Sequence, residues 1–191
     1  LVQEDIASWK EFLNPKYTSQ AAFIDDFREV MGVLIKLQGS EFRNASEDNA
    51  KNALSDLRKL SKGKISYTAD SRQLLENGTM ALVHAYNGDV AKIQKTRPEW
   101  KFILPKEGYS VWTDTLASPK NAPHPELADQ FINFVLDPEQ NKLIPMDLGF
   151  ASGVDFSKTN VRLPEDIQNN PTIFVDLQFG FYLGNPPSEV L

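Results

Sequence analysis

Two carboxylates stand three residues apart at the point where a predicted buried strand ends. The run 25–29 reads Asp-Asp-Phe-Arg-Glu, which places Asp26 and Glu29 at the start of a predicted helix. This spacing is typical of a capping box, in which both side chains bond to backbone N–H groups of the first turn. The alternative is a pair of carboxylates at the mouth of a crevice, directed at a cation. Spacing alone favours the capping box.

A tryptophan and an aspartate form a second candidate site. Trp112 and Asp114 are two residues apart in a predicted strand, and such residues point to the same face. A cation over a tryptophan ring gains about 0.5–2 kcal/mol, and a charge-assisted hydrogen bond adds about 1.5–3 kcal/mol. The alternative is a core tryptophan beside a surface aspartate. The pattern favours neither interpretation.

The remaining candidates for chemistry are few. Tyr86 ends another predicted strand, where its ring is either a pocket wall or a core residue with a bonded hydroxyl. His84 and His124 are isolated and fit no metal-binding spacing, and we expect His84 to be a core histidine with satisfied hydrogen bonds. Nucleophile, P-loop and dinucleotide motifs are absent from the sequence. We therefore expect no metal, no cofactor and no enzyme; a hydrolase that uses the carboxylates named above is the less favoured alternative.

Composition limits the class of protein. Of the 191 residues, 41% are apolar and 24% are charged, as in ordinary globular domains. Lys and Arg number 20 against 26 Asp and Glu, and the net charge of −6 is opposite to that of a general nucleic-acid binder. No apolar run approaches the roughly 20 residues of a membrane helix, and there is no cysteine. Because the sequence starts at Leu1 without Met or a signal peptide, we expect a mature protein, a fragment or a trimmed chain.

Short apolar runs alternate with helical periodicity over much of the chain. The apolar runs predict strands over 21–25, 64–68, 80–86, 100–105 and 109–117. Periodicity and capping residues predict helices over 27–38, 46–60, 71–77, 90–95, 125–136 and 164–168. This alternation predicts the α/β class, whose parallel sheets bind ligands in the crevice beyond the carboxyl ends of the strands. The helix at 125–136 has one apolar face, made of Leu127, Phe131, Phe134 and Val135.

Four segments, in order along the chain, resemble a known family. They are residues 8–17, similar to S-W-x-D-L-W-x-P-x-Y; residues 25–30, similar to D-D-x-R-E-V; residues 105–114, similar to P-K-E-G-x-x-x-W-x-D; and residues 131–138, similar to F-I-N-F-L-L-D-P. Each segment alone is weakly specific. The ordered set, which runs from about Ser8 to Gln178, is similar to the spermidine/putrescine-binding proteins of bacterial ABC importers.

The resemblance implies a periplasmic binding protein that closes on putrescine or spermidine and delivers it to the membrane permease of the importer. It implies that Asp26 and Glu29 bind ammonium or imino groups. It also implies that Trp112 and Asp114 supply an aromatic wall and a carboxylate, and that Gln178 is a late pocket glutamine.

Two positions depart from the family pattern. Tyr86 stands where the family usually has Trp, and Phe150 stands where many members have Tyr. Both keep aromatic surface at the implied site, and Phe150 loses a hydroxyl. The exact polyamine is therefore left open. The alternative within the same fold is a binder of another small solute, such as a sugar, an amino acid or a metal.

The resemblance also implies a fold and a division of the chain. The fold is type II periplasmic-binding-protein-like, with two lobes. The family begins with a first-lobe segment that nothing before Leu1 represents, so we expect the second lobe plus part of the first. Residues 1–113 would be mostly the second lobe, 114–154 would return to the first lobe, and 155–191 would return to the second.

Overall fold

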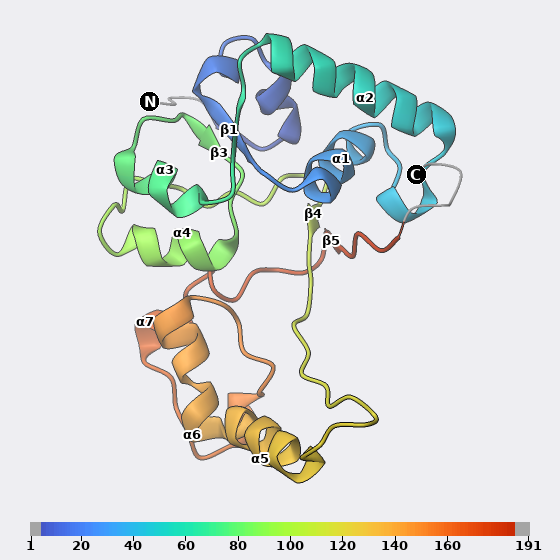
Figure 1. Ribbon diagram of the computed structural model, residues 1–191. Helices are drawn as coiled ribbons and strands as arrows, with labels where there is room; N and C mark the ends of the chain where they lie inside the picture. The colour runs from blue at the N-terminus through green and yellow to red at the C-terminus, as the bar shows by residue number, and fades with distance from the viewer. Residues whose placement is uncertain (1–4, 186–191) are drawn as a thin grey trace.

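Short parallel strands covered by helices form the upper part of the molecule (Figure 1), and residues 5–185 are described in this computed structural model. The strands β1 (Ala21–Ile24), β2 (Ser66–Thr68) and β3 (Leu82–Val83) form one parallel sheet in the order β2-β1-β3. A second parallel pair joins β4 (Tyr109–Ser110) to β5 (Gly180–Phe181), which brings the C-terminal part of the chain back to this region.

The helices follow the strands in the predicted alternation. They are α1 (Phe27–Lys36), α2 (Glu47–Lys62), α3 (Ser71–Asn77), α4 (Asn87–Gln94), α5 (Pro125–Leu136), α6 (Pro138–Asn141) and α7 (Glu165–Gln168). Short helical turns complete the set: η1 (Trp9–Leu13), η2 (Thr18–Gln20), η3 (Phe42–Asn44), η4 (Ile144–Leu148) and η5 (Phe156–Lys158). The α/β class predicted from the sequence is confirmed.

The core explains why β1 is an uninterrupted apolar run. β1 is the central strand, all four of its residues are buried, and helices and turns cover it, as a parallel strand requires. The main cluster joins η1, β1, α1 and α2, and its largest fully buried side chains are Phe23, Leu34, Ile35 and Leu60. The candidate carboxylates Asp26 and Glu29 lie at the carboxyl end of β1, where the chain enters α1.

Three strand predictions are wrong in extent, and the first of them, over 80–86, is reduced to β3. Residues 100–105 form no strand. At the start of this run Trp100 bonds to the neighbouring helices instead: its indole N–H donates to Leu75 O at 2.9 Å, and Gln94 Nε2 donates to Trp100 O at 3.0 Å. The strand predicted over 109–117 ends at Ser110. The last ladder-like bond runs from Val111 N–H to Phe181 O at 2.9 Å, since the partner strand β5 ends there.

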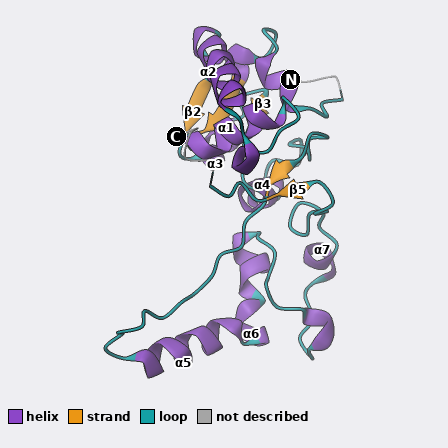
Figure 2. Ribbon diagram, turned by 90° about the vertical axis from the view of Figure 1, so that its right-hand side faces the viewer, coloured by secondary structure: helices purple, strands orange, loops and turns teal. Residues whose placement is uncertain are grey.

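The lower part of the molecule is an extension that holds α5, α6 and α7 (Figures 1 and 2). An extended segment after β4 leads to it, and a second segment leads back to β5. α5 has the predicted bounds, but none of its residues is buried, and Leu127, Phe131 and Phe134 are each more than half exposed. The contact with the upper part runs through α4, where Ala91 packs with apolar side chains of residues 163–173.

The assignment of segments 1–113, 114–154 and 155–191 to two lobes stays a prediction, and residues 1–4 and 186–191 of it lie outside the described residues. Between residues 5 and 185, no helix is long and apolar enough to cross a membrane.

Candidate ligand-binding site

The two carboxylates at the end of β1 have different structural roles. Asp26 caps α1: its Oδ1 accepts the backbone N–H groups of Arg28 at 2.8 Å and Glu29 at 3.2 Å. Glu29 does not reach back to complete a capping box. Its Oε2 accepts a hydrogen bond from the hydroxyl of Ser110, at 2.7 Å, on strand β4. The capping-box interpretation is therefore correct for Asp26 and wrong for Glu29.

Glu29 is a buried carboxylate, only 9% exposed. Burial raises its pKa, the Ser110 hydrogen bond lowers it, the charge of Asp26 raises it and that of Arg28 lowers it. Within residues 5–185 Glu29 has no ion-pair partner, because the Arg28 guanidinium donates to the carbonyl of Gly184 instead. A carboxylate desolvated in this way gains most from a cation brought to it.

Three rings from different parts of the chain meet beside these acids, and we call them the aromatic corner: Tyr86, Trp112 and Phe150. The Tyr86 and Trp112 centroids are 4.8 Å apart and those of Trp112 and Phe150 are 6.2 Å apart, both pairs edge to face. Trp112 is 44% exposed, so the alternative of a core tryptophan is wrong. The corner is an open apolar wall.

Electrostatics link the acids to the aromatic corner. The pKa of the Tyr86 hydroxyl is raised, first by burial and then by the negative charges of Glu29, Asp26 and Asp89. Tyr86 begins the turn into α4, and Asp26 ends the turn into α1, so both follow the carboxyl ends of neighbouring parallel strands. This is the edge where parallel sheets present ligand-binding groups.

Two glycines allow Phe150 to reach the corner. A Cβ at Gly88 would lie 2.6 Å from the Phe150 ring, and one at Gly149, which has φ +76°, would lie 2.7 Å from the Gly88 carbonyl oxygen. Only glycine permits this approach at both positions. Neither the two glycines nor Ser110 was predicted as part of the site. The Asn87-Gly88 pair is typical of a turn, and in the structure it forms the first turn of α4.

Asp114 and Gln178 are not brought to the aromatic corner by any described contact. Both are exposed, and the strand that would have placed Asp114 on the face of Trp112 ends at Ser110. The backbone N–H of Gln178 donates to the Asp176 carboxylate at 2.9 Å, in the turn before β5. Their roles in binding stay predictions.

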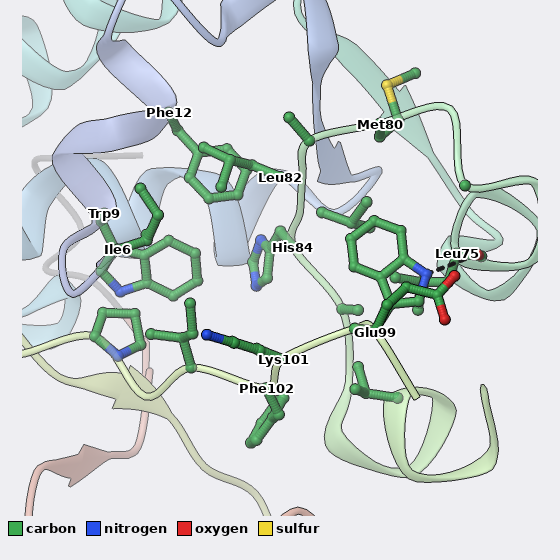
Figure 3. Close-up of a pocket in the computed structure, with 18 of the residues that line it drawn as sticks. Ile6, Trp9, Phe12, Leu75, Met80, Leu82, His84, Glu99, Lys101 and Phe102 are labelled. Atoms are coloured by element: carbon green, nitrogen blue, oxygen red, sulfur yellow. Dashed lines mark hydrogen bonds between the residues drawn. The ribbon is translucent and has the colours of Figure 1, made fainter. Parts of the chain in front are cut away.

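A cavity of about 720 Å³ lies elsewhere, between β3 and residues 99–105 (Figure 3). Its walls are mainly apolar, with Trp9, Phe12 and Phe102 among them, and none of the seven predicted site residues lines it. Figure 3 shows the His84 ring at this cavity, beside Trp9. The structure therefore separates this cavity from the predicted site.

His84 is buried, as predicted, with its ring edge to face against Trp9 at 4.9 Å and Phe23 at 5.6 Å. Its Nδ1 has no hydrogen-bond partner in the described part of the chain, so the prediction of a satisfied histidine is wrong for this atom. Burial lowers the pKa of His84 to about 4, against a smaller opposing effect of Asp26. The ring is neutral at neutral pH. Among the described residues, no three His, Asp or Glu side chains are grouped to hold a metal ion.

Comparison with known proteins supplies the family. Residues 1–175 match the family model described as bacterial extracellular solute-binding protein. The chain belongs to this family. Bacterial extracellular solute-binding proteins are not an enzyme family, and the resemblance noted in the sequence is confirmed.

Individual relatives of this solute-binding protein carry more specific names. Spermidine/putrescine-binding periplasmic protein 1 of Haemophilus influenzae is 27% identical over 173 residues, which is 90% of this chain and 47% of that protein. Putrescine-binding periplasmic protein PotF of Escherichia coli is 26% identical over 182 residues, which is 88% of this chain and 49% of that protein. The chain thus spans about half the length of the curated relatives it matches.

Solved structures show the fold. A Listeria monocytogenes protein described as a spermidine/putrescine ABC transporter matches with a TM-score of 0.86 at 21% identity, over 98% of this chain and 59% of that one. A spermidine/putrescine ABC transporter substrate-binding protein of Streptococcus pneumoniae matches with a TM-score of 0.77 at 19% identity, over 95% of this chain and 57% of that one. The predicted periplasmic-binding-protein-like fold, present in part, is confirmed.

Proposed function

We propose that this solute-binding chain supplies one wall of a site for a linear polyamine, putrescine or spermidine, which is bound and released unchanged. Asp26, Glu29 and Asp114 would pair with the ammonium groups. The aromatic corner would flank the methylene chain, and Gln178 would donate or accept a hydrogen bond. A polyamine needs carboxylates and flat apolar surface, and the carboxyl end of the sheet brings Asp26 and Glu29 close to Tyr86 of the aromatic corner.

The observation that carries the proposal is the environment of Glu29. It is a buried carboxylate without an ion-pair partner in the described structure, and it lies close to Tyr86, whose ring contacts Trp112. Removing a carboxylate from water without a partner is unfavourable, and an ammonium group offsets that desolvation. A neutral solute would gain little from this arrangement, so the acid favours a cationic ligand over a sugar.

The proposal includes a cellular location and a protein partner, the membrane permease of an ABC importer. The relatives named above are periplasmic binding proteins by name, which supports a periplasmic location for this chain. Delivery of the polyamine would be to the membrane permease of an ABC importer. The net charge of −6 supports a cationic ligand and no nucleic acid.

The experiment is an NMR titration of the chain, because chemical shifts report weak as well as tight binding. Putrescine and spermidine should shift the Trp112 indole signal, and 1,4-butanediol, a neutral molecule of the same length as putrescine, should not. Glu29→Gln keeps the shape of the side chain and removes the charge, so it should weaken binding about tenfold or more, as expected for a lost charge-assisted hydrogen bond. Glu165→Gln, at an exposed first-turn glutamate of α7, is the matched control and should have no effect.

Two results would overturn the proposal. One is the absence of any response at Trp112 to either polyamine. The other is an equal response to butanediol or to a neutral sugar, with Glu29→Gln binding as the wild type does.

A further inference from the structure

Ser110 stands at a junction that the sequence did not reveal. It is the last residue of β4, two residues before Trp112, and its side chain is half-buried against α1. Its hydroxyl donates to Glu29 Oε2 at 2.7 Å, across 81 positions of sequence. Within residues 5–185, Ser110 is the residue whose side chain donates a hydrogen bond to the Glu29 carboxylate.

The groups around Glu29 affect the ionisation of its carboxyl group in opposite directions. On α1, Asp26 disfavours a second negative charge and Arg28 favours it. From the turn between β3 and α4, Tyr86 faces the same acids. From β4, Ser110 contributes a neutral hydroxyl that stabilises the ionised carboxylate. Burial opposes ionisation, so the hydroxyl is the group that offsets burial most directly.

We propose that Ser110 is a positioning residue that keeps Glu29 ionised and fixes one of its oxygens, leaving the carboxylate able to bind a cationic nitrogen beside the aromatic corner. The part of this inference that concerns cation binding rests on the proposed function. Ser110 would touch the carboxylate and not the ligand. Its effect would therefore depend on pH, whereas a residue that only supports the fold would act equally at every pH.

The expected direction of the effect on binding follows from the groups that shift the pKa of Glu29. Removing the hydroxyl leaves burial and Asp26 to raise the pKa of Glu29, so a larger fraction of Glu29 is protonated at a given acidic pH. A protonated Glu29 has no charge to offer an ammonium group. Ser110→Ala should therefore weaken polyamine binding about tenfold at the acidic end of the range, where a lost hydrogen bond to a charged group has its full effect. At alkaline pH, where Glu29 is ionised in both proteins, the difference should be small.

The first test needs no ligand. Carboxyl-carbon NMR should follow the titration of Glu29 in the wild-type chain, in Ser110→Ala and in Ser110→Thr, which keeps a hydroxyl. We expect the Glu29 midpoint to move to higher pH in Ser110→Ala and to return toward the wild-type value in Ser110→Thr. An unchanged midpoint in Ser110→Ala would overturn the inference, whatever the chain binds.

The second test measures putrescine affinity as a function of pH in the wild type, in Ser110→Ala, in Glu29→Gln and in the double variant. If Ser110 acts through Glu29, Ser110→Ala has no pH-dependent effect once Glu29 is Gln. A loss that is the same at every pH, or that persists in the Glu29→Gln background, would contradict the inference. Should the wild type bind no polyamine while the Glu29 midpoint still moves, the proposed function would fail and the coupling of Ser110 to Glu29 would stand.

Discussion

The buried His84 should make the stability of the fold depend on pH. Its pKa in the folded chain is about 4, below the ordinary value of 6.5, because burial disfavours the charged ring. The folded state therefore binds fewer protons than the unfolded state between these values. The contribution of the neutral ring to stability is complete above pH 6.5 and is lost as the pH falls toward 4. A difference of 2.5 pH units, at about 1.36 kcal/mol each, is about 3 kcal/mol.

His84→Phe tests this value. Phenylalanine keeps a ring between Trp9 and Phe23, cannot be protonated and removes the unpartnered Nδ1. Urea unfolding from pH 7.5 to pH 4 should show the wild type losing about 3 kcal/mol more than the variant. His124→Phe, at the exposed second histidine, should keep the wild-type dependence. Parallel curves for the wild type and His84→Phe would refute the reasoning. So would a ring titration of wild-type His84 with its midpoint near 6.5, which NMR can record without any variant.

Variants at Gly88 and Asp26 test the packing of the aromatic corner and the two roles of Asp26. Gly88→Ala should displace Phe150 from Trp112 and destabilise the chain by about 1–3 kcal/mol. Gly153→Ala is the control and should not destabilise the chain, because a Cβ there meets nothing within 4 Å. Equal unfolding midpoints for the two variants would contradict the packing of Phe150 against Gly88. Asp26→Ser should keep the cap of α1 and the stability of the chain while weakening putrescine binding. Asp26→Ala should weaken binding and also lose about 1 kcal/mol of stability, because the cap is removed. Unchanged putrescine affinity in Asp26→Ser would show that Asp26 only caps the helix.

Local signals in the sequence were enough to predict several elements. β1 is a short apolar run because it is buried on both faces, and α1 starts where Asp26 caps it. α5 was predicted with both ends correct, since Pro125 suits the first turn and the apolar spacing continues to Leu136. Amphipathic spacing says which face of α5 is apolar, but it does not say whether that face is packed. In the described structure it is exposed.

The site could be predicted only in part, because its contacts join distant segments. At Asp26 and Trp112 the residue types allowed cation binding as one of two interpretations, and the family resemblance favoured it; Tyr86 was either a pocket wall or a core residue. The hydrogen bond from Ser110 to Glu29 leaves no trace in local spacing, and a capping box explained Glu29 as well. The strand predicted past Ser110 does not form, because residues of high β-propensity still need a partner strand and β5 is only two residues long.

The most direct test of the account is to locate a bound polyamine by NMR. Intermolecular nuclear Overhauser effects should connect the methylene protons of putrescine to the rings of Tyr86, Trp112 and Phe150 at pH 7.5, and these contacts should weaken in Glu29→Gln. Contacts to Trp9 and Phe102 instead would place the ligand in the cavity beside His84. That result would contradict the claim that an unpaired buried acid and an open aromatic corner form the binding site.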